Sequence, residues 1–243
     1  MKATNLRYRL STHRRVEELH ELLPRDIIFF YRLRHVKFQR NLTQNFSRSF
    51  DRFFIEKNAS VKYVEKHYGS GNGKGKRILN PGTEIYMDEG SYAELEMVQI
   101  KGVDDTERTT TANLKAGAKL LVRERLMTHG DQRAISLYDI VIDGEGASAD
   151  VVSRSVARDN SYQKFEAKIV GNKACHGHTE CDSIIMDNGR ILAVPGLEAN
   201  DVDAELFHEA AIGKIAGEQL IKLMSLGLTE AEAEEQIING FLK

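Results

Sequence analysis

The middle of the chain alternates short apolar stretches with turn residues. Between residues 81 and 198 no helical stripe persists, and strand-like runs are separated by Gly, Asn and Asp. A weak repeat begins at Gly90, Gly117, Gly146 and Gly171, with spacings of 27, 29 and 25 residues. Each unit has a glycine, a small or apolar residue three positions later, and then a strand. A strand-only period of this length is typical of a solenoid, but short strands with regular turns also suit an antiparallel sandwich.

The first 80 residues have a different pattern. Residues 6–38 are predicted to be helical, because Ser11 and Thr12 precede an apolar stripe at helical spacing (Val16, Leu19, Leu22 and Leu23). Pro24 separates this stripe from a second apolar cluster at residues 27–33. Aromatic residues interleaved with Arg and Lys over residues 36–66 predict some strand. We therefore expect a mixed, basic N-terminal segment over residues 1–80, followed by a β core over residues 81–216.

The last segment, residues 217–243, predicts two short helices. One apolar face combines Leu220, Ile221, Leu223 and Met224. Gly227 follows where a helix C′ glycine is expected. Thr229 and Glu232 have the spacing of a capping box, and Ala233, Ile237 and Phe241 line one face of the final helix. These helices could cap a solenoid or present a docking surface to a partner.

Charge divides the chain unevenly. The formal net charge is −2, yet residues 1–80 hold 18 Lys and Arg against 7 Asp and Glu, whereas residues 81–243 hold 16 against 29. No base-reading motif accompanies the basic half, so nucleic acid is not the expected partner. A solvated face or a docking face for an acidic surface is the simpler interpretation.

No apolar run reaches the roughly 18 residues that a membrane span needs. The N-terminus lacks the apolar region of a signal peptide, so a cytoplasmic location without membrane contact is expected. In that compartment the two cysteines of the chain are expected to be free thiols or metal ligands rather than a disulfide.

Both cysteines lie in one short segment, with two histidines between them: Cys175, His176, His178 and Cys181. Thiolate and imidazole are ligands of soft and borderline metals, so the four side chains suggest a mononuclear zinc or metal site. If the segment is a strand, however, the thiols share one face and the histidines share the other. A small buried Cys is also common inside a narrow solenoid, which favours a core role for Cys175. An interaction module without chemistry is the third interpretation.

Several motifs in the last third resemble one family. They are Cys181-Asp182-Ser183, Pro195-Gly196-Leu197-Glu198, His208-Glu209-Ala210, the Ser225–Leu228 turn, the Glu230–Ala233 helix and the closing Asn239-Gly240-Phe241. In this order they resemble the SufB/SufD family, the scaffold proteins of the SUF system for iron–sulfur cluster assembly. The Cys and the His-Glu-Ala motif together are more similar to SufB than to SufD, in a short, minimal form.

The resemblance implies a right-handed parallel β-helix core, which favours the solenoid over the sandwich. It implies a scaffold rather than an enzyme, with ATP used only by a SufC-type ABC ATPase that engages the C-terminal helices. A homodimer, or a heterodimer with a SufD-like chain, is implied through the β-helix, together with a sulfur donor and apo-acceptor proteins. A transient iron–sulfur cluster would be bound by Cys181, His208 and Glu209, with Cys175 as a further candidate ligand.

Overall fold

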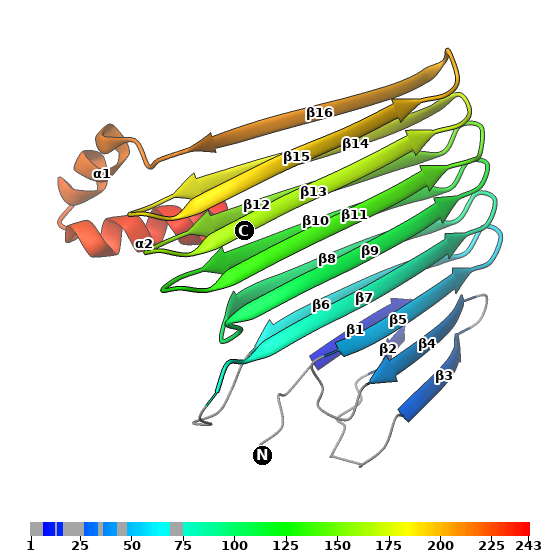
Figure 1. Ribbon diagram of the computed structural model, residues 1–243, viewed down its shortest axis with the longest axis horizontal. Helices are drawn as coiled ribbons and strands as arrows, with labels where there is room; N and C mark the ends of the chain where they lie inside the picture. The colour runs from blue at the N-terminus through cyan, green and yellow to red at the C-terminus, as the bar shows by residue number, and fades with distance from the viewer. Residues whose placement is uncertain (1–6, 13, 17–26, 34–35, 43–47, 69–74) are drawn as a thin grey trace.

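Long strands stacked in register form the frame of the molecule (Figure 1). The computed structural model describes residues 7–12, 14–16, 27–33, 36–42, 48–68 and 75–243. The first sheet has the order β16-β14-β12-β10-β8-β6-β1-β2. Its strands are β1 (Arg7–Thr12), β2 (Arg14–Val16), β6 (Ser60–Tyr68), β8 (Tyr92–Lys101), β10 (Lys119–Thr128), β12 (Ser148–Ala157), β14 (Cys175–Ile185) and β16 (Ala204–Gly213).

The second sheet has the order β15-β13-β11-β9-β7-β5-β4-β3. Its strands are β3 (Ile27–Leu33), β4 (Val36–Leu42), β5 (Arg48–Ile55), β7 (Ile78–Met87), β9 (Asp105–Leu114), β11 (Arg133–Ile142), β13 (Tyr162–Gly171) and β15 (Arg190–Ala199). From β5 onward the chain alternates between the two sheets, and every strand pairs in parallel with the strand two positions later. The six pairs from β5–β6 to β15–β16 are the coils of a flattened parallel β-solenoid, as expected.

Glycines stack at the turns between successive strands. Gly90, Gly117 and Gly146 have positive φ angles of 65°, 65° and 67°, a conformation that other residues adopt rarely. The amide of Gly90 donates to the carbonyl of Ala116 at 2.9 Å, which ties one turn to the next. Gly171 differs from these three glycines, because it is the last residue of β13. A Cβ there would lie 2.9 Å from Sγ of Cys175, so this fourth glycine of the repeat makes room in the interior.

Strand alternation builds the interior between the two sheets. In β10, β12 and β13 alternate residues are buried, as the period of two requires. The buried apolar residues form one cluster along the stack, which includes Leu114, Leu120, Ile140, Ile169 and both cysteines. The parallel register aligns equivalent residues of successive coils in columns along the solenoid. One column runs through Glu65, Met97, Glu124, Ser153, Cys181 and Ala210.

The helix expected over residues 6–38 is wrong wherever that segment is described. Arg7–Thr12, Arg14–Val16 and Ile27–Leu33 are strands, and residues 17–26 lie outside the described part. β1 pairs antiparallel with β6, and β3 pairs antiparallel with β4, so edge pairing onto the sheets overrides a helical spacing. The strand expected within residues 36–66 is confirmed by β4, β5 and β6. The parallel stack begins with β5 and thus includes residues that the charge pattern grouped with the N-terminal segment.

Two helices follow the last coil, as expected: α1 (Gly217–Met224) and α2 (Glu230–Phe241). The capping box is present, with the amide of Glu232 donating to Oγ1 of Thr229. Gly227 has a φ of 97° in the turn between the helices. Neither helix is long and apolar enough to cross a membrane.

The second helix packs against the side of the first sheet, below its outermost strand (Figure 1). Outward residues of three neighbouring strands, Met127, Val156 and Ile184, form an apolar row under it. Ile238 and Leu242 are the buried helix-side residues of this contact, whereas Ile237 is only half-buried. No residue of α1 is buried. No residue of β15 or β16 is fully buried either, so these helices leave the open end of the solenoid uncovered.

Candidate functional site

β14 carries the cysteine and histidine segment, and its pleat sorts the side chains as the sequence predicted. Cys175, Thr179 and Cys181 are buried in the interior, and His176 and His178 point to the outer face. The two thiols are six residues apart, which in a strand is roughly 20 Å. The four side chains therefore do not converge on a single ion, and the mononuclear site that combined them has no geometric basis.

Cys181 lies in the interior, one coil before the open end. Its side chain belongs to the core cluster, and the residue is 1% exposed. Burial raises the pKa of the Cys181 thiol, and the carboxylate of Glu124 adds to the rise. Sγ lies 3.7 Å from Oγ of Ser183, which in turn lies 2.9 Å from Oγ of Ser155. The thiol is thus held protonated in a packed setting, where it is less reactive than an exposed cysteine.

His208 joins the same inner face from the last strand. β14 and β16 are parallel, with Thr179 opposite His208 and Cys181 opposite Ala210. From the strand spacing and the rise per residue, His208 and Cys181 are diagonal neighbours about 8 Å apart. Nδ1 of His208 lies 2.7 Å from Oγ1 of Thr179, which fixes the ring orientation. His208 is half-buried because no coil follows β16 among the described residues.

Glu209 faces the opposite way. It follows His208 in the same strand, so the pleat directs it to the outer face, where its side chain is 74% exposed. There it lies beside Glu180 and His178, with 3.9 Å between its Oε2 and Nε2 of His178. The four expected ligands therefore fall into three places. Cys181 and His208 share the inner face, Glu209 lies outside, and Cys175 lies at the far end of β14.

Thr179, Ser183 and Glu180 are site residues that the sequence did not single out. The period of two, counted from Cys181, was enough to place Thr179 and Ser183 on the thiol face and Glu180 on the other face. Their partners could not be counted in the same way, because they depend on the register between β14 and its neighbours. That register is fixed by the turns between the coils.

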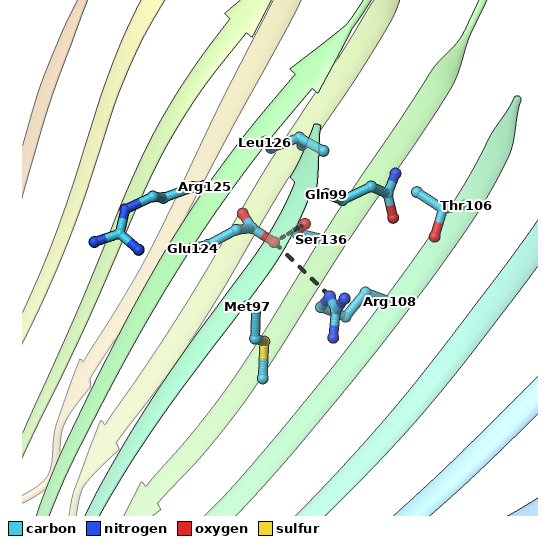
Figure 2. Close-up of a pocket in the computed structure, with 8 residues that line it drawn as sticks. All are labelled: Met97, Gln99, Thr106, Arg108, Glu124, Arg125, Leu126 and Ser136. Atoms are coloured by element: carbon cyan, nitrogen blue, oxygen red, sulfur yellow. Dashed lines mark hydrogen bonds and ion pairs between the residues drawn. The ribbon is translucent and has the colours of Figure 1, made fainter. Parts of the chain in front are cut away.

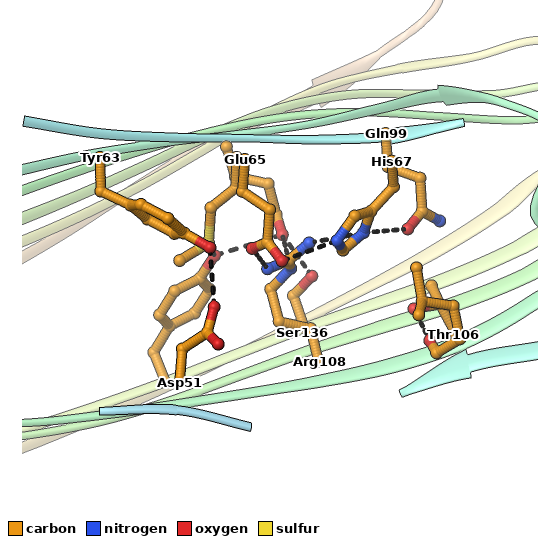
Figure 3. A network of polar contacts seen from close by, with 12 residues as sticks. Asp51, Tyr63, Glu65, His67, Gln99, Thr106, Arg108 and Ser136 are labelled. Atoms are coloured by element: carbon orange, nitrogen blue, oxygen red, sulfur yellow. Dashed lines mark hydrogen bonds and ion pairs between the residues drawn. The ribbon is translucent and has the colours of Figure 1, made fainter. Parts of the chain in front are cut away.

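A buried polar network occupies the interior further from the open end (Figure 3). Nη1 of Arg108 donates to Oε2 of Glu65 at 2.6 Å, and Nη2 lies 3.0 Å from Nδ1 of His67. A guanidinium only donates, so Nδ1 accepts, and Nε2 of His67 donates to Glu65 at 2.7 Å. Burial alone would raise the pKa of Glu65, but Arg108 and His67 outweigh it and hold that pKa far below its usual range.

The network extends toward Cys181 through Glu124 (Figure 2). Ser136 and Ser153 donate to the two carboxylate oxygens of Glu124 at 2.5 and 2.9 Å, and Nε of Arg108 lies 4.0 Å away. A cavity of about 10 Å³, enough for about one water molecule, lies between Met97, Arg108 and Glu124. Ser153 is the neighbour of Cys181 in the same column. A line of buried polar side chains within the otherwise apolar interior therefore reaches the coil that holds the thiol.

Comparison with known proteins assigns the chain to a family. The sequence matches the family described as SUF system FeS cluster assembly, SufBD core domain, over residues 102–241, which is more than half of the chain. This range includes Cys175, Cys181, His208, Glu209 and both helices.

Curated relatives with the same family name occur in archaea and in mycobacteria, and three archaeal ones cover most of this chain. An iron–sulfur cluster assembly SufBD family protein of Methanothermobacter thermautotrophicus is 42% identical over 194 residues, covering 78% of this chain and 46% of the relative. One from Methanocaldococcus jannaschii is 31% identical over 193 residues, covering 77% and 60%. One from Archaeoglobus fulgidus is 30% identical, covering 79% and 51%. The chain thus spans about half the length of these relatives. On the family match and these identities together, it belongs to the SufB/SufD family.

Proposed function

We propose that the protein is a scaffold on which an iron–sulfur cluster is assembled, with Cys181 and His208 as ligands at the open end of the solenoid. Family membership supports the general role. The observation that carries the specific site is that a thiol and an imidazole lie on one inner face, diagonal to each other on the last two strands of a sheet. Thiolate is the usual protein ligand of iron–sulfur clusters, and imidazole replaces it in some of them. Cys175, at the far end of β14, is left out of this ligand set.

The open end is incomplete as an interior surface, which supports assembly with a second chain. β15 and β16 are the last strands of their sheets, and no described strand pairs with their outer edges. Leu197 and Ile212, at inward positions of these strands, are 41% and 40% exposed. Exposed edges and apolar side chains of this kind favour association. We propose a homodimer that meets end to end, and a SufD-like chain is the alternative partner.

Two-fold pairing of the open ends supplies what one chain lacks. At the position of Cys181 a single subunit offers one thiol and one imidazole on the inner face, whereas a cluster takes about four protein ligands. An isologous contact brings the same residues of a second copy to the interface. The cluster is then held by two Cys181 and two His208 side chains, a thiolate-poor set suited to releasing the cluster to apo-acceptor proteins.

The partner that opens this interface is proposed to be a SufC-like ABC ATPase docked on α1. None of the α1 residues is buried, and its apolar residues Ile221 and Met224 are 68% and 42% exposed. An amphipathic helix with an uncovered apolar face is a common docking element. ATP is bound and hydrolysed in the partner, and closure of two such partners on a dimer shifts the subunits and admits iron and sulfur to Cys181. A separate sulfur donor is part of this proposal.

Anaerobic reconstitution with ferrous iron and sulfide tests the site. We expect the native chain to acquire iron, sulfide and visible absorbance, and we expect Cys181→Ser and His208→Ala to lose them. Cys175→Ser is the matched control, because it removes the other buried thiol of the same strand. Equal iron and sulfide contents in the native chain and Cys181→Ser contradict the proposal and favour an interaction module without cluster chemistry. Light scattering of the same samples measures the dimer.

A further inference from the structure

A second group of potential ligands lies on the outer face of the first sheet, separate from the thiols. Ligand atoms of His178, Glu180 and Glu209 all lie within 4.8 Å of one another. The group spans two parallel strands, β14 and β16, with Glu180 directly opposite Glu209 and His178 two residues before Glu180. Its geometry is therefore set by the sheet register and not by a loop.

This group breaks the charge pattern of the outer surface. Elsewhere on the two sheets, several carboxylates lie directly opposite a cation of the neighbouring coil, as in Arg52–Glu84, Lys62–Glu94 and Arg133–Asp105. Glu180 instead faces another carboxylate, a pairing that is unfavourable on neighbouring strands. The nearest cationic side chain in register, Arg154, lies opposite Asp182 and not opposite the glutamates. The rung of Glu180 and Glu209 thus lacks the cation that those three rungs have.

His178 is oriented by a further carboxylate. Oδ1 of Asp150, on β12, lies 3.5 Å from Nδ1 of His178, and Nε2 of the same ring lies 3.9 Å from Oε2 of Glu209. A carboxylate behind one ring nitrogen, with the other nitrogen directed at further ligands, is the usual arrangement around a metal-binding histidine. This relation is independent of the two glutamates, because Asp150 comes from a third strand.

We propose that His178, Glu180 and Glu209 bind one first-row divalent metal ion, with ferrous iron as the ion of interest. One imidazole nitrogen and two carboxylate oxygens leave coordination positions for water, and the set has no thiolate, which suits Fe²⁺ or Mn²⁺ better than a structural zinc site. The proposal of the ion site does not depend on the proposed function. Its use as a store of iron beside the cluster site rests on the proposed function.

Metal titration of the metal-free protein tests the site. Two metal ions serve as probes. Binding of Mn²⁺ is measured by calorimetry and electron paramagnetic resonance, and binding of Fe²⁺ is measured under anaerobic conditions. We expect one ion per chain. His178→Ala, Glu180→Gln and Glu209→Gln should each weaken binding at least 10-fold, and Asp150→Asn should weaken it about 10- to 100-fold.

His176→Ala and Glu205→Gln are the matched controls. These residues form a histidine–carboxylate contact on the same outer face, with Nδ1 of His176 4.0 Å from Oε2 of Glu205. We expect both controls to bind Mn²⁺ within about twofold of the native affinity. No binding by the native chain, or equal losses in controls and ligand variants, overturns the site and indicates diffuse attraction to an acidic surface.

The two proposals fail separately. Cys181→Ser should keep its Mn²⁺ affinity while losing the reconstituted cluster. If the native chain binds Mn²⁺ at the outer site but never assembles a cluster, the scaffold proposal fails and the ion site stands. If it assembles a Cys181-dependent cluster but binds no ion outside it, the ion site fails and the scaffold proposal stands.

Discussion

Oγ1 of Thr179 lies 2.7 Å from Nδ1 of His208, although the two residues are 29 positions apart along the chain. The contact joins the last two strands of one sheet on their inner face, beside Cys181. A hydrogen bond to one ring nitrogen selects the tautomer and directs the other nitrogen. Thr179 is therefore a positioning residue for the histidine that we propose as a cluster ligand.

Replacing Thr179 with Val should loosen a reconstituted cluster without unfolding the protein. Loss of an outer-shell partner typically costs 10- to 100-fold in metal affinity, because the ligating ring is no longer held in place. The measurement is the rate at which a chelator removes iron from the reconstituted protein. Thr179→Ser keeps the hydroxyl and should behave as the native chain does. Equal iron-release rates for the Val and Ser variants would show that this contact does not position a ligand.

Substitution at Gly177 tests how tightly the last coil closes over the segment. A Cβ at Gly177 would lie 2.7 Å from Cδ2 of Leu206 and 2.8 Å from Cγ2 of Ile169. Gly177→Ala should therefore destabilise the protein by about 1–3 kcal/mol, which is typical of an overpacked core. Gly213→Ala is the control, since nothing lies within 4 Å of its Cβ position. Denaturant unfolding measures the stability of both variants. Equal midpoints would mean that the last coil shifts to accommodate the added methyl group without loss of stability.

Most of the fold can be predicted from the sequence, and its exceptions have physical causes. Gly90, Gly117 and Gly146 indicate the turns because their positive φ angles favour glycine. The strands at residues 7–16 could not be found, since they are defined by pairing with β6 and with each other and not by their own spacing. Local propensity is a weak guide wherever distant backbone groups supply the hydrogen bonds.

The candidate site can be predicted only in part. Strand alternation by itself separates the thiols from His176 and His178. The same rule also requires that His208 and Glu209, as consecutive residues of a strand, face opposite ways. The sequence alone could not predict the register between β14 and β16, which places Thr179 opposite His208. That register depends on the length and shape of the turn at residues 200–203.

The interior pair of Glu65 and Arg108 should be costly to break. The Arg108 and Glu65 side chains are 4% and 1% exposed, so Glu65→Gln leaves a buried guanidinium without its carboxylate. We expect a loss of about 3–5 kcal/mol in the free energy of unfolding. Glu84→Gln breaks a partly exposed Arg–Glu pair between coils and should cost far less. Similar losses in the two variants would mean that burial adds nothing to the strength of the interior pair.

Acid should weaken the fold through the same carboxylate. Because Arg108 and His67 hold the pKa of Glu65 below its unfolded value, the unfolded chain takes up the proton first as the pH falls. The stability from this group is complete above the usual carboxyl range, near pH 4.3, and declines below it. Unfolding free energies measured from pH 7 down to pH 3 should fall more steeply for the native chain than for Glu65→Gln. Parallel curves would contradict this assignment.

The two thiols should differ from free cysteine in their reactivity. Burial raises the pKa of both Cys175 and Cys181, so the reactive thiolate is scarce in the folded chain. Iodoacetamide labelling followed by mass spectrometry should be slow for both, slowest for Cys181, and fast in denaturant. As the pH rises above about 8.5, the thiols of the unfolded chain ionise before those of the folded chain, so the free energy of unfolding declines there. Rapid labelling of Cys181 in the native chain would contradict a closed last coil.

The pleat of β14 and β16 also bears on how the sequence can change over generations. A substitution at an outward position such as Glu209 or His178 alters the surface without disturbing the packing around Cys181, and the reverse holds for Thr179 and His208. The two faces of the same few residues can therefore drift at different rates. In an alignment of relatives, sequence variability along β14 and β16 should therefore alternate from one position to the next. The inward positions and the outward positions would each be constrained by a different function.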